Sequence, residues 1–162
     1  MYAKDSYVFH THCGVCQVVD VAPLSGDPSG SLYYVLRPLH GDDGSNIVRV
    51  PFDNPASLRR PLDKALAEEL IENWPDVNTD LYISDSKKRK LAYETALRSG
   101  MVEDLAVLLE GAMQRKARDG HLNSMDAQFV NRAAPIVYGE LGFALGMSVE
   151  DTKAYVASRT GR

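Results

Sequence analysis

The sequence predicts an α+β fold, in which a small antiparallel β domain over residues 1–60 precedes an all-α helical bundle over residues 61–162. Two observations indicate this class. Short runs rich in valine, tyrosine and isoleucine, separated by turn residues, fill the first half. From about residue 62 the apolar residues recur every three or four positions, which is typical of amphipathic helices. We place the boundary between residues 56 and 64.

The β domain is expected to contain four closely spaced strands. Turn residues separate them in "PLSGDPSGS" and "HGDDGS", where glycine, proline, aspartate and serine supply special backbone angles and local hydrogen bonds. Such short spacing predicts a Tudor-like barrel or a strongly bent sheet. Glycine and serine around Asp42 and Asp43 favour a plain turn over a catalytic carboxylate pair. The strands are expected within residues 5–12, 14–22, 30–39 and 45–53.

Five helices with short connections are expected in the second half, as in a compact bundle. Ser84 or Asp85 can cap the second helix, and Gly100 can end it. Pro135 is expected to kink or split the fourth helix, because an interior proline costs roughly 3 kcal/mol. In the first helix, Leu66, Leu70, Ile71 and Trp74 fall on one face. The helices are expected within residues 63–74, 84–100, 101–120, 123–146 and 148–159.

Composition narrows the class of protein. The net charge of -4 argues against a protein that coats nucleic acid, but a local basic site can still act because charges are screened within about 8 Å. No apolar run approaches the ~20 residues of a membrane span, and the N-terminus lacks a signal-peptide pattern, so a cytoplasmic protein without a membrane partner is expected. Because no phosphate-binding glycine loop, nucleophile elbow or metalloprotease helix occurs, neither an enzyme nor a cofactor is expected.

The segment "HTHCGVC" offers an alternative chemistry. His10, His12, Cys13 and Cys16 are potential zinc ligands, and the two cysteines form a C-x-x-C pair. No second ligand cluster completes a zinc site, and redox C-x-x-C pairs usually precede a helix that is missing here. Small apolar thiols and partly exposed histidines are therefore favoured, and a zinc or redox protein stays open as an alternative.

Two basic features can each be interpreted in two ways. The run Lys87-Lys88-Arg89-Lys90 opens the second helix, and it is either a solvated helix face or a contact with phosphates. Arg49 alternates with apolar residues in "IVRVPFD". It either faces solvent or helps a β edge to dock against another sheet.

The order of these features resembles the CarD family of bacterial transcription regulators over nearly the whole chain. In the β domain, "YVFHTHCGVCQVVDV", "LYYVLRPL" and "NIVRVPFDN" are similar to successive strands of that family. In the helical domain, "YETALRSGMVEDLAVLL" resembles its helix, Ser-Gly break and next helix, and "LNSMDAQFVNRAAPIVYGELGFALGMSVEDTKAYV" resembles its C-terminal helices. The ordered series over two domains carries the resemblance more than any single motif.

The resemblance implies a regulator that binds the β subunit of bacterial RNA polymerase through the β domain. It also implies that the helical domain contacts promoter DNA at the upstream fork of the transcription bubble. There an aromatic wedge stabilises the open complex through non-specific DNA contacts. We expect a monomer that is associated with the nucleoid through the polymerase. A polymerase-binding module without a DNA function is left as an alternative.

Carried over residue by residue, the resemblance assigns Arg49 to the polymerase contact, flanked by Ile47 and Pro51. Leu24 stands near the position of a second polymerase-contacting arginine of the family.

The DNA side is assigned in the same way. Tyr82 takes the position of the wedge when the alignment is counted back from Tyr93. Trp74, the only tryptophan, is favoured as a packing residue and stays open as the alternative wedge, because the family's wedge is a tryptophan. The basic residues that follow the wedge are Lys87, Lys88, Arg89 and Lys90.

Overall fold

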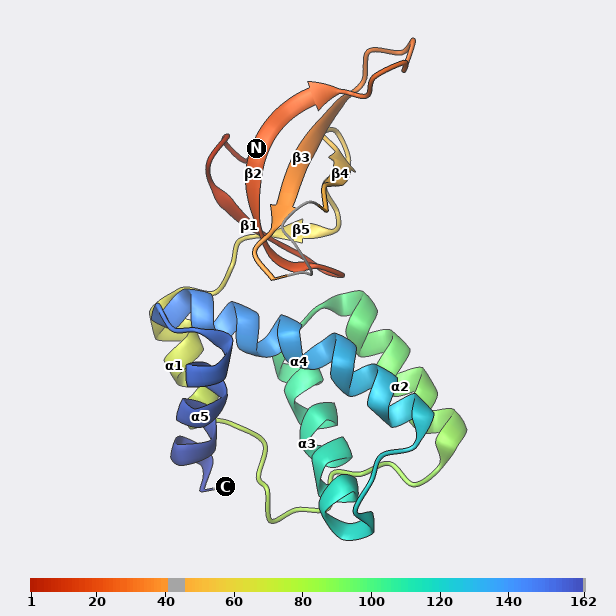
Figure 1. Cartoon of the computed structure of the whole chain (residues 1–162), viewed down its shortest axis with the longest axis vertical. Helices are drawn as coiled ribbons and strands as arrows, with labels where there is room; N and C mark the ends of the chain where they lie inside the picture. The colour runs from red at the N-terminus through yellow and green to blue at the C-terminus, as the bar shows by residue number, and fades with distance from the viewer. Residues whose placement is uncertain (41–45, 162) are drawn as a thin grey trace. The chain divides into compact units, whose positions relative to one another are not determined.

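A computed structural model of the chain describes residues 1–40 and 46–161. An antiparallel sheet is followed by helices, so the predicted α+β class is confirmed. The chain divides into two compact units, Met1–Pro61 and Leu62–Arg162, at a point inside the predicted interval 56–64. We call them the β unit and the helical unit and describe each by itself (Figure 1). Asp42 and Asp43 lie outside the described residues.

The β unit is a five-stranded antiparallel half-barrel with the strand order β4-β3-β2-β1-β5. A register shift between Val18 and Asp20 marks a bulge in β2, and bulges bend a strand and increase its twist. The sequence does not predict β5, because two residues are too few to show an alternating pattern. The strands are β1 Tyr7–His10, β2 Gly14–Pro23, β3 Leu32–Pro38, β4 Val48–Pro51 and β5 Leu58–Arg59.

One face of this sheet carries the apolar core of the β unit. On β3, Tyr34 and Leu36 are buried while their neighbours are more exposed, which is the period-two pattern of a strand with one covered face. The rings of Tyr34 and Phe52 pack with their centroids 4.9 Å apart. The buried members of this core are Val8, Cys16, Val18, Tyr34, Leu36, Val50 and Leu58.

In the helical unit, α4 packs against each of the other four helices (Figure 1). Asp85 caps α2 by accepting a hydrogen bond from the backbone N–H of Lys88, and Gly100 ends it in the left-handed conformation with φ of 64°. No helix in the described part of the chain is long and apolar enough to cross a membrane. The helices are α1 Lys64–Glu72, α2 Ser86–Ser99, α3 Val102–Asp119, α4 Ser124–Leu145 and α5 Val149–Thr160.

One helical expectation needs correction, and another is narrowed. Of the kink or split expected at Pro135, the split does not occur, because α4 runs without a break from Ser124 to Leu145. Pro135 has no N–H to donate within the helix, which leaves one backbone carbonyl without its usual partner. Because Pro135 is exposed, water can hydrate that carbonyl. Leu66 is 50% exposed and does not share the buried face of α1 with Leu70 and Ile71. Ala67 takes that place, because it precedes Leu70 and Ile71 by three and four residues.

Candidate functional site

The predicted protein contact lies on an edge of the sheet. β4 pairs with β3, and no other described strand lies beside it. Val50 points into the core, whereas Arg49 and Pro51 are exposed, and so is Ile47 just before the strand. The structure therefore brings Ile47, Arg49 and Pro51 to the outward face of one edge strand.

The backbone of β4 also presents hydrogen-bonding groups at this edge. The N–H of Phe52 donates to the carbonyl of Leu32 at 2.9 Å, and antiparallel ladders alternate between bonded and non-bonded pairs. Val50 is two residues from Phe52, so its backbone groups point toward β3, while those of Arg49 point away from the sheet. Pro51, two residues beyond Arg49, has no N–H, so the row of outward-facing donors ends there. The edge can accept a short added strand but not a long one.

The basic run on α2 does not act as one surface. Lys87, Lys88 and Lys90 are exposed, as a phosphate contact requires. Arg89 is only 4% exposed, and this corrects its assignment as a DNA contact. It lies on the buried face of α2, four residues before Tyr93 and seven before Ala96, so helical geometry turns it inward.

Arg89 belongs to a buried polar cluster centred on Asp126 of α4, which is completely buried. The Arg89 Nε donates to Asp126 Oδ1 at 2.8 Å, and the hydroxyl of Tyr93 donates to the same oxygen at 2.8 Å. The hydroxyl of Tyr82 donates to Asp126 Oδ2 at 3.2 Å. Arg89 Nη1 also donates to the carbonyls of Ile83 and Ser84. We call these four side chains the Asp126 cluster: Tyr82, Arg89, Tyr93 and Asp126.

The cluster holds the Arg89–Asp126 ion pair in a buried site. Burial raises the pKa of Tyr93 well above its usual range, and the hydrogen bond to Asp126 raises it further. Burial and the charge of Asp126 also raise the pKa of Tyr82. Burial alone would lower the pKa of Arg89, but the hydrogen bond and charge of Asp126 outweigh that effect and raise it. Both phenols therefore stay protonated and donate to the carboxylate.

Tyr82 is held at the surface by this cluster rather than projecting freely. Its ring is partly exposed, and the guanidinium carbons of Arg89 and Arg115 lie 4.7 and 5.0 Å from the ring centroid. The loop before it is tied to α3, because Gln114 Oε1 accepts from the N–H of Leu81 at 2.9 Å. A Cβ on Gly111 would lie 2.7 Å from the carbonyl oxygen of Leu81, so only glycine lets the loop approach α3 this closely.

Trp74 is a packing residue, as the sequence predicts. It is 8% exposed, and its ring stacks on Tyr138 with centroids 6.4 Å apart. Its indole N–H donates to Oε1 of the buried Glu110 at 2.9 Å. The ring therefore contributes to the core of the helical unit.

The "HTHCGVC" segment lies in and beyond β1 and differs in part from expectation. His10 is 7% exposed rather than partly exposed, and burial lowers its pKa, with a smaller effect from His12. Burial raises the pKa of the Cys13 thiol and, together with Cys13, raises that of Cys16 to about 12. Reactive and metal-binding cysteines need a lowered pKa, so the direction opposes the redox alternative. No group of three or more potential metal ligands occurs within residues 1–40 and 46–161.

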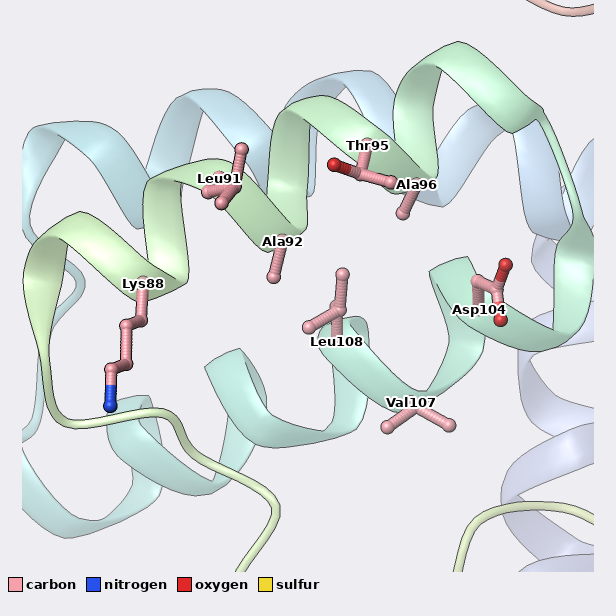
Figure 2. Close-up of a pocket in the computed structure, with 8 residues that line it drawn as sticks. All are labelled: Lys88, Leu91, Ala92, Thr95, Ala96, Asp104, Val107 and Leu108. Atoms are coloured by element: carbon pink, nitrogen blue, oxygen red, sulfur yellow. The ribbon is translucent and has the colours of Figure 1, made fainter.

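One surface feature has no counterpart among the sequence predictions. An apolar groove lies between α2 and α3, and Leu91, Ala92, Val107 and Leu108 line it (Figure 2). Leu91 precedes Tyr93 by two residues and therefore does not lie on the buried face of α2. This position of an apolar residue in the helical pattern is the sequence signal that could have indicated the groove. Asp126 was likewise not indicated, because an aspartate in the first turn of a helix is ordinary.

No protein-family model matches the chain, and no curated protein is significantly similar to it. The assignment to the CarD family therefore stays a prediction.

Proposed function

We propose that this protein is a non-enzymatic transcription regulator that binds the β subunit of bacterial RNA polymerase and stabilises the promoter open complex. The resemblance supplies the identity of the partner. The observation that carries the proposal is the geometry of β4, an edge strand whose arginine and backbone groups both face outward. In this proposal the protein acts in the cytoplasm, where the polymerase and nucleoid are.

The polymerase contact is proposed as an addition of β4 to a sheet edge of the β subunit. Main-chain hydrogen bonds of Arg49 give affinity, and its guanidinium selects the partner by pairing with a carboxylate. Ile47, which is 37% exposed, adds apolar contact beside it. Pro51 stops the pairing and prevents unlimited strand addition.

Replacing Arg49 with glutamate should weaken binding to the isolated β subunit by a few kcal/mol, because a charge pair at the centre of an interface is reversed. Calorimetric titration measures the loss. Lys4→Glu is the matched control, since Lys4 is exposed and lies in the segment before β1 rather than on β4. Equal affinities for wild type, Arg49→Glu and Lys4→Glu would refute the role of Arg49.

The DNA contact is proposed for the exposed lysines of the basic run and the partly exposed ring of Tyr82. Lys87 and Lys90 lie at the start of α2 and extend into solvent, where they can reach phosphates. Lys90 is 3.9 Å from Glu94, but both side chains are exposed, and such a pair is weak enough to exchange for a phosphate. Contacts of this kind recognise the backbone and the shape of the fork rather than base sequence.

The double variant Lys87→Gln/Lys90→Gln should reduce the slope of log affinity against log salt by about 0.9 for each lost contact. The measurement is binding to polymerase–promoter complexes over a salt series, repeated on an unrelated promoter. Lys64→Gln/Arg132→Gln removes the same charge from exposed positions on α1 and α4 and should leave the slope unchanged.

A polymerase-binding module without DNA function is the second candidate. The burial of Arg89 favours it, because it leaves three exposed cations where the sequence indicates four. An unchanged salt slope for Lys87→Gln/Lys90→Gln, together with an unchanged open-complex lifetime for Tyr82→Ala and intact binding to the β subunit, would favour this alternative.

A further inference from the structure

The groove between α2 and α3 is apolar and open to solvent, with a volume of about 520 Å³. Ala92 and Ala96 of α2 face it with small side chains (Figure 2). Leu91 and Val107 stand at its sides and are 64% and 40% exposed. Leu91 and Val107 thus stand beside the small side chains of Ala92 and Ala96. Covering this apolar surface lowers the free energy, because it removes the surface from water.

The two ends of the groove carry opposite charges. Figure 2 shows Lys88 at one end and Asp104 at the other, with the apolar side chains between them. Lys88 and Asp104 are both exposed, and neither forms an ion pair with any side chain in the part of the chain that the structure describes. Each charge is therefore available to a group outside its own chain.

We propose that a second copy of this chain occupies the groove, in an antiparallel dimer with two-fold symmetry. A two-fold axis across the groove exchanges its ends, so Lys88 of each copy meets Asp104 of the other. The same operation lays Leu91 of each copy over the small residues Ala92 and Ala96 of the other. The surface is thus complementary to itself in charge and in shape.

This self-complementarity favours a second copy over a helix from another protein. A helix with one sign of charge would match only one end of the groove, whereas a second copy matches both. The contact is short, because the 14 residues of α2 span only about 21 Å. We therefore infer a weak dimer that depends on concentration, in place of the monomer expected from the sequence. This inference does not depend on the proposed function.

The experiment is sedimentation velocity of the purified full-length chain without DNA, from about ten micromolar to about one millimolar. Wild type should shift from monomer to dimer over this range. Lys88→Glu and Asp104→Lys should each raise the dissociation constant about tenfold or more, because each makes both end pairs repulsive. Lys87→Glu is the matched control, since Lys87 is exposed on the same turn but does not line the groove, and it should behave as wild type.

The decisive measurement is sedimentation of a mixture of the two single variants, Lys88→Glu and Asp104→Lys. Glu at position 88 of one copy then faces Asp104→Lys of the other, and the unchanged Asp104 faces the unchanged Lys88, so the mixture should form a heterodimer although neither variant dimerises alone. The double variant Lys88→Glu/Asp104→Lys should dimerise like wild type for the same reason. A chain that stays monomeric at the highest concentration, or a mixture that stays monomeric while wild type dimerises, overturns the proposal. Circular dichroism of each variant establishes that the helices are intact.

Discussion

Asp126→Ala should destabilise the helical unit by about 3 to 5 kcal/mol, because it leaves the buried guanidinium of Arg89 without its counter-charge. Arg89 is 4% exposed and Asp126 is completely buried, so water cannot replace the lost carboxylate. The hydroxyls of Tyr82 and Tyr93 lose their acceptor at the same time. Urea unfolding followed by the fluorescence of Trp74, which lies in the same unit, measures the loss.

Two comparisons separate a buried ion pair from a general effect of charge. Asp151→Ala removes an exposed carboxylate from the first turn of α5 and should cost less than about 1 kcal/mol. The double variant Arg89→Met/Asp126→Leu removes both charges and should recover much of the stability lost in Asp126→Ala, because no lone charge stays buried. If Asp126→Ala unfolds like wild type, the Asp126 cluster does not stabilise the unit in the way its geometry indicates.

Trp74→Ala should lower the stability of the helical unit by about 3 to 5 kcal/mol, while Tyr82→Ala should act mainly on the open complex. Trp74 is buried against Tyr138 and donates to Glu110, so its removal leaves a cavity and takes a donor from a buried carboxylate. Tyr82 has a partly exposed ring that can stack on an exposed base, which is worth about 1 to 3 kcal/mol. Tyr82→Ala should therefore shorten the lifetime of the open complex by roughly tenfold per 1.4 kcal/mol lost.

The measurement is open-complex decay after a heparin challenge, run beside an unfolding curve for each variant. Tyr82→Phe keeps the ring but loses the hydroxyl bond to Asp126, so its decay rate shows how much of the effect depends on a fixed ring. Trp74→Phe keeps an aromatic ring in the core and should cost less stability than Trp74→Ala. If Trp74→Ala speeds decay without destabilising the fold and Tyr82→Ala changes nothing, the two roles are reversed.

The predictions for Asp126 and Tyr82 are linked, because the hydroxyl of Tyr82 donates a hydrogen bond to Asp126. Asp126 accepts hydrogen bonds from Arg89 in the core and from Tyr82 near the surface. Weakening the cluster should therefore free the ring of Tyr82 as well as destabilise α2 against α4. Variants of Asp126 are expected to change open-complex lifetime only because the ring of Tyr82 is no longer held in place.

The sequence by itself determined the order and type of the larger elements. Arg49 alternates with apolar residues along β4, and it is exposed as that pattern indicates. The caps at Asp85 and Gly100 and the boundary near Pro61 could also be predicted. These features follow from local geometry, because a residue's preference for a cap, a turn or one face of a strand depends on neighbours a few positions away.

Only the tertiary structure determined which residues of the basic run are buried and where the apolar groove lies. Lys88, Arg89 and Lys90 are consecutive in the sequence, yet the middle one is buried because Asp126, 37 residues away, accepts its hydrogen bond. A single charged helix face does not reveal such a partner. Leu91 is exposed because no described helix covers that side of α2, and the opposite charges of Lys88 and Asp104 flank one groove only after α3 folds back along α2. Burial and pairing depend on packing between distant segments, and the local pattern that predicts a helix does not determine them.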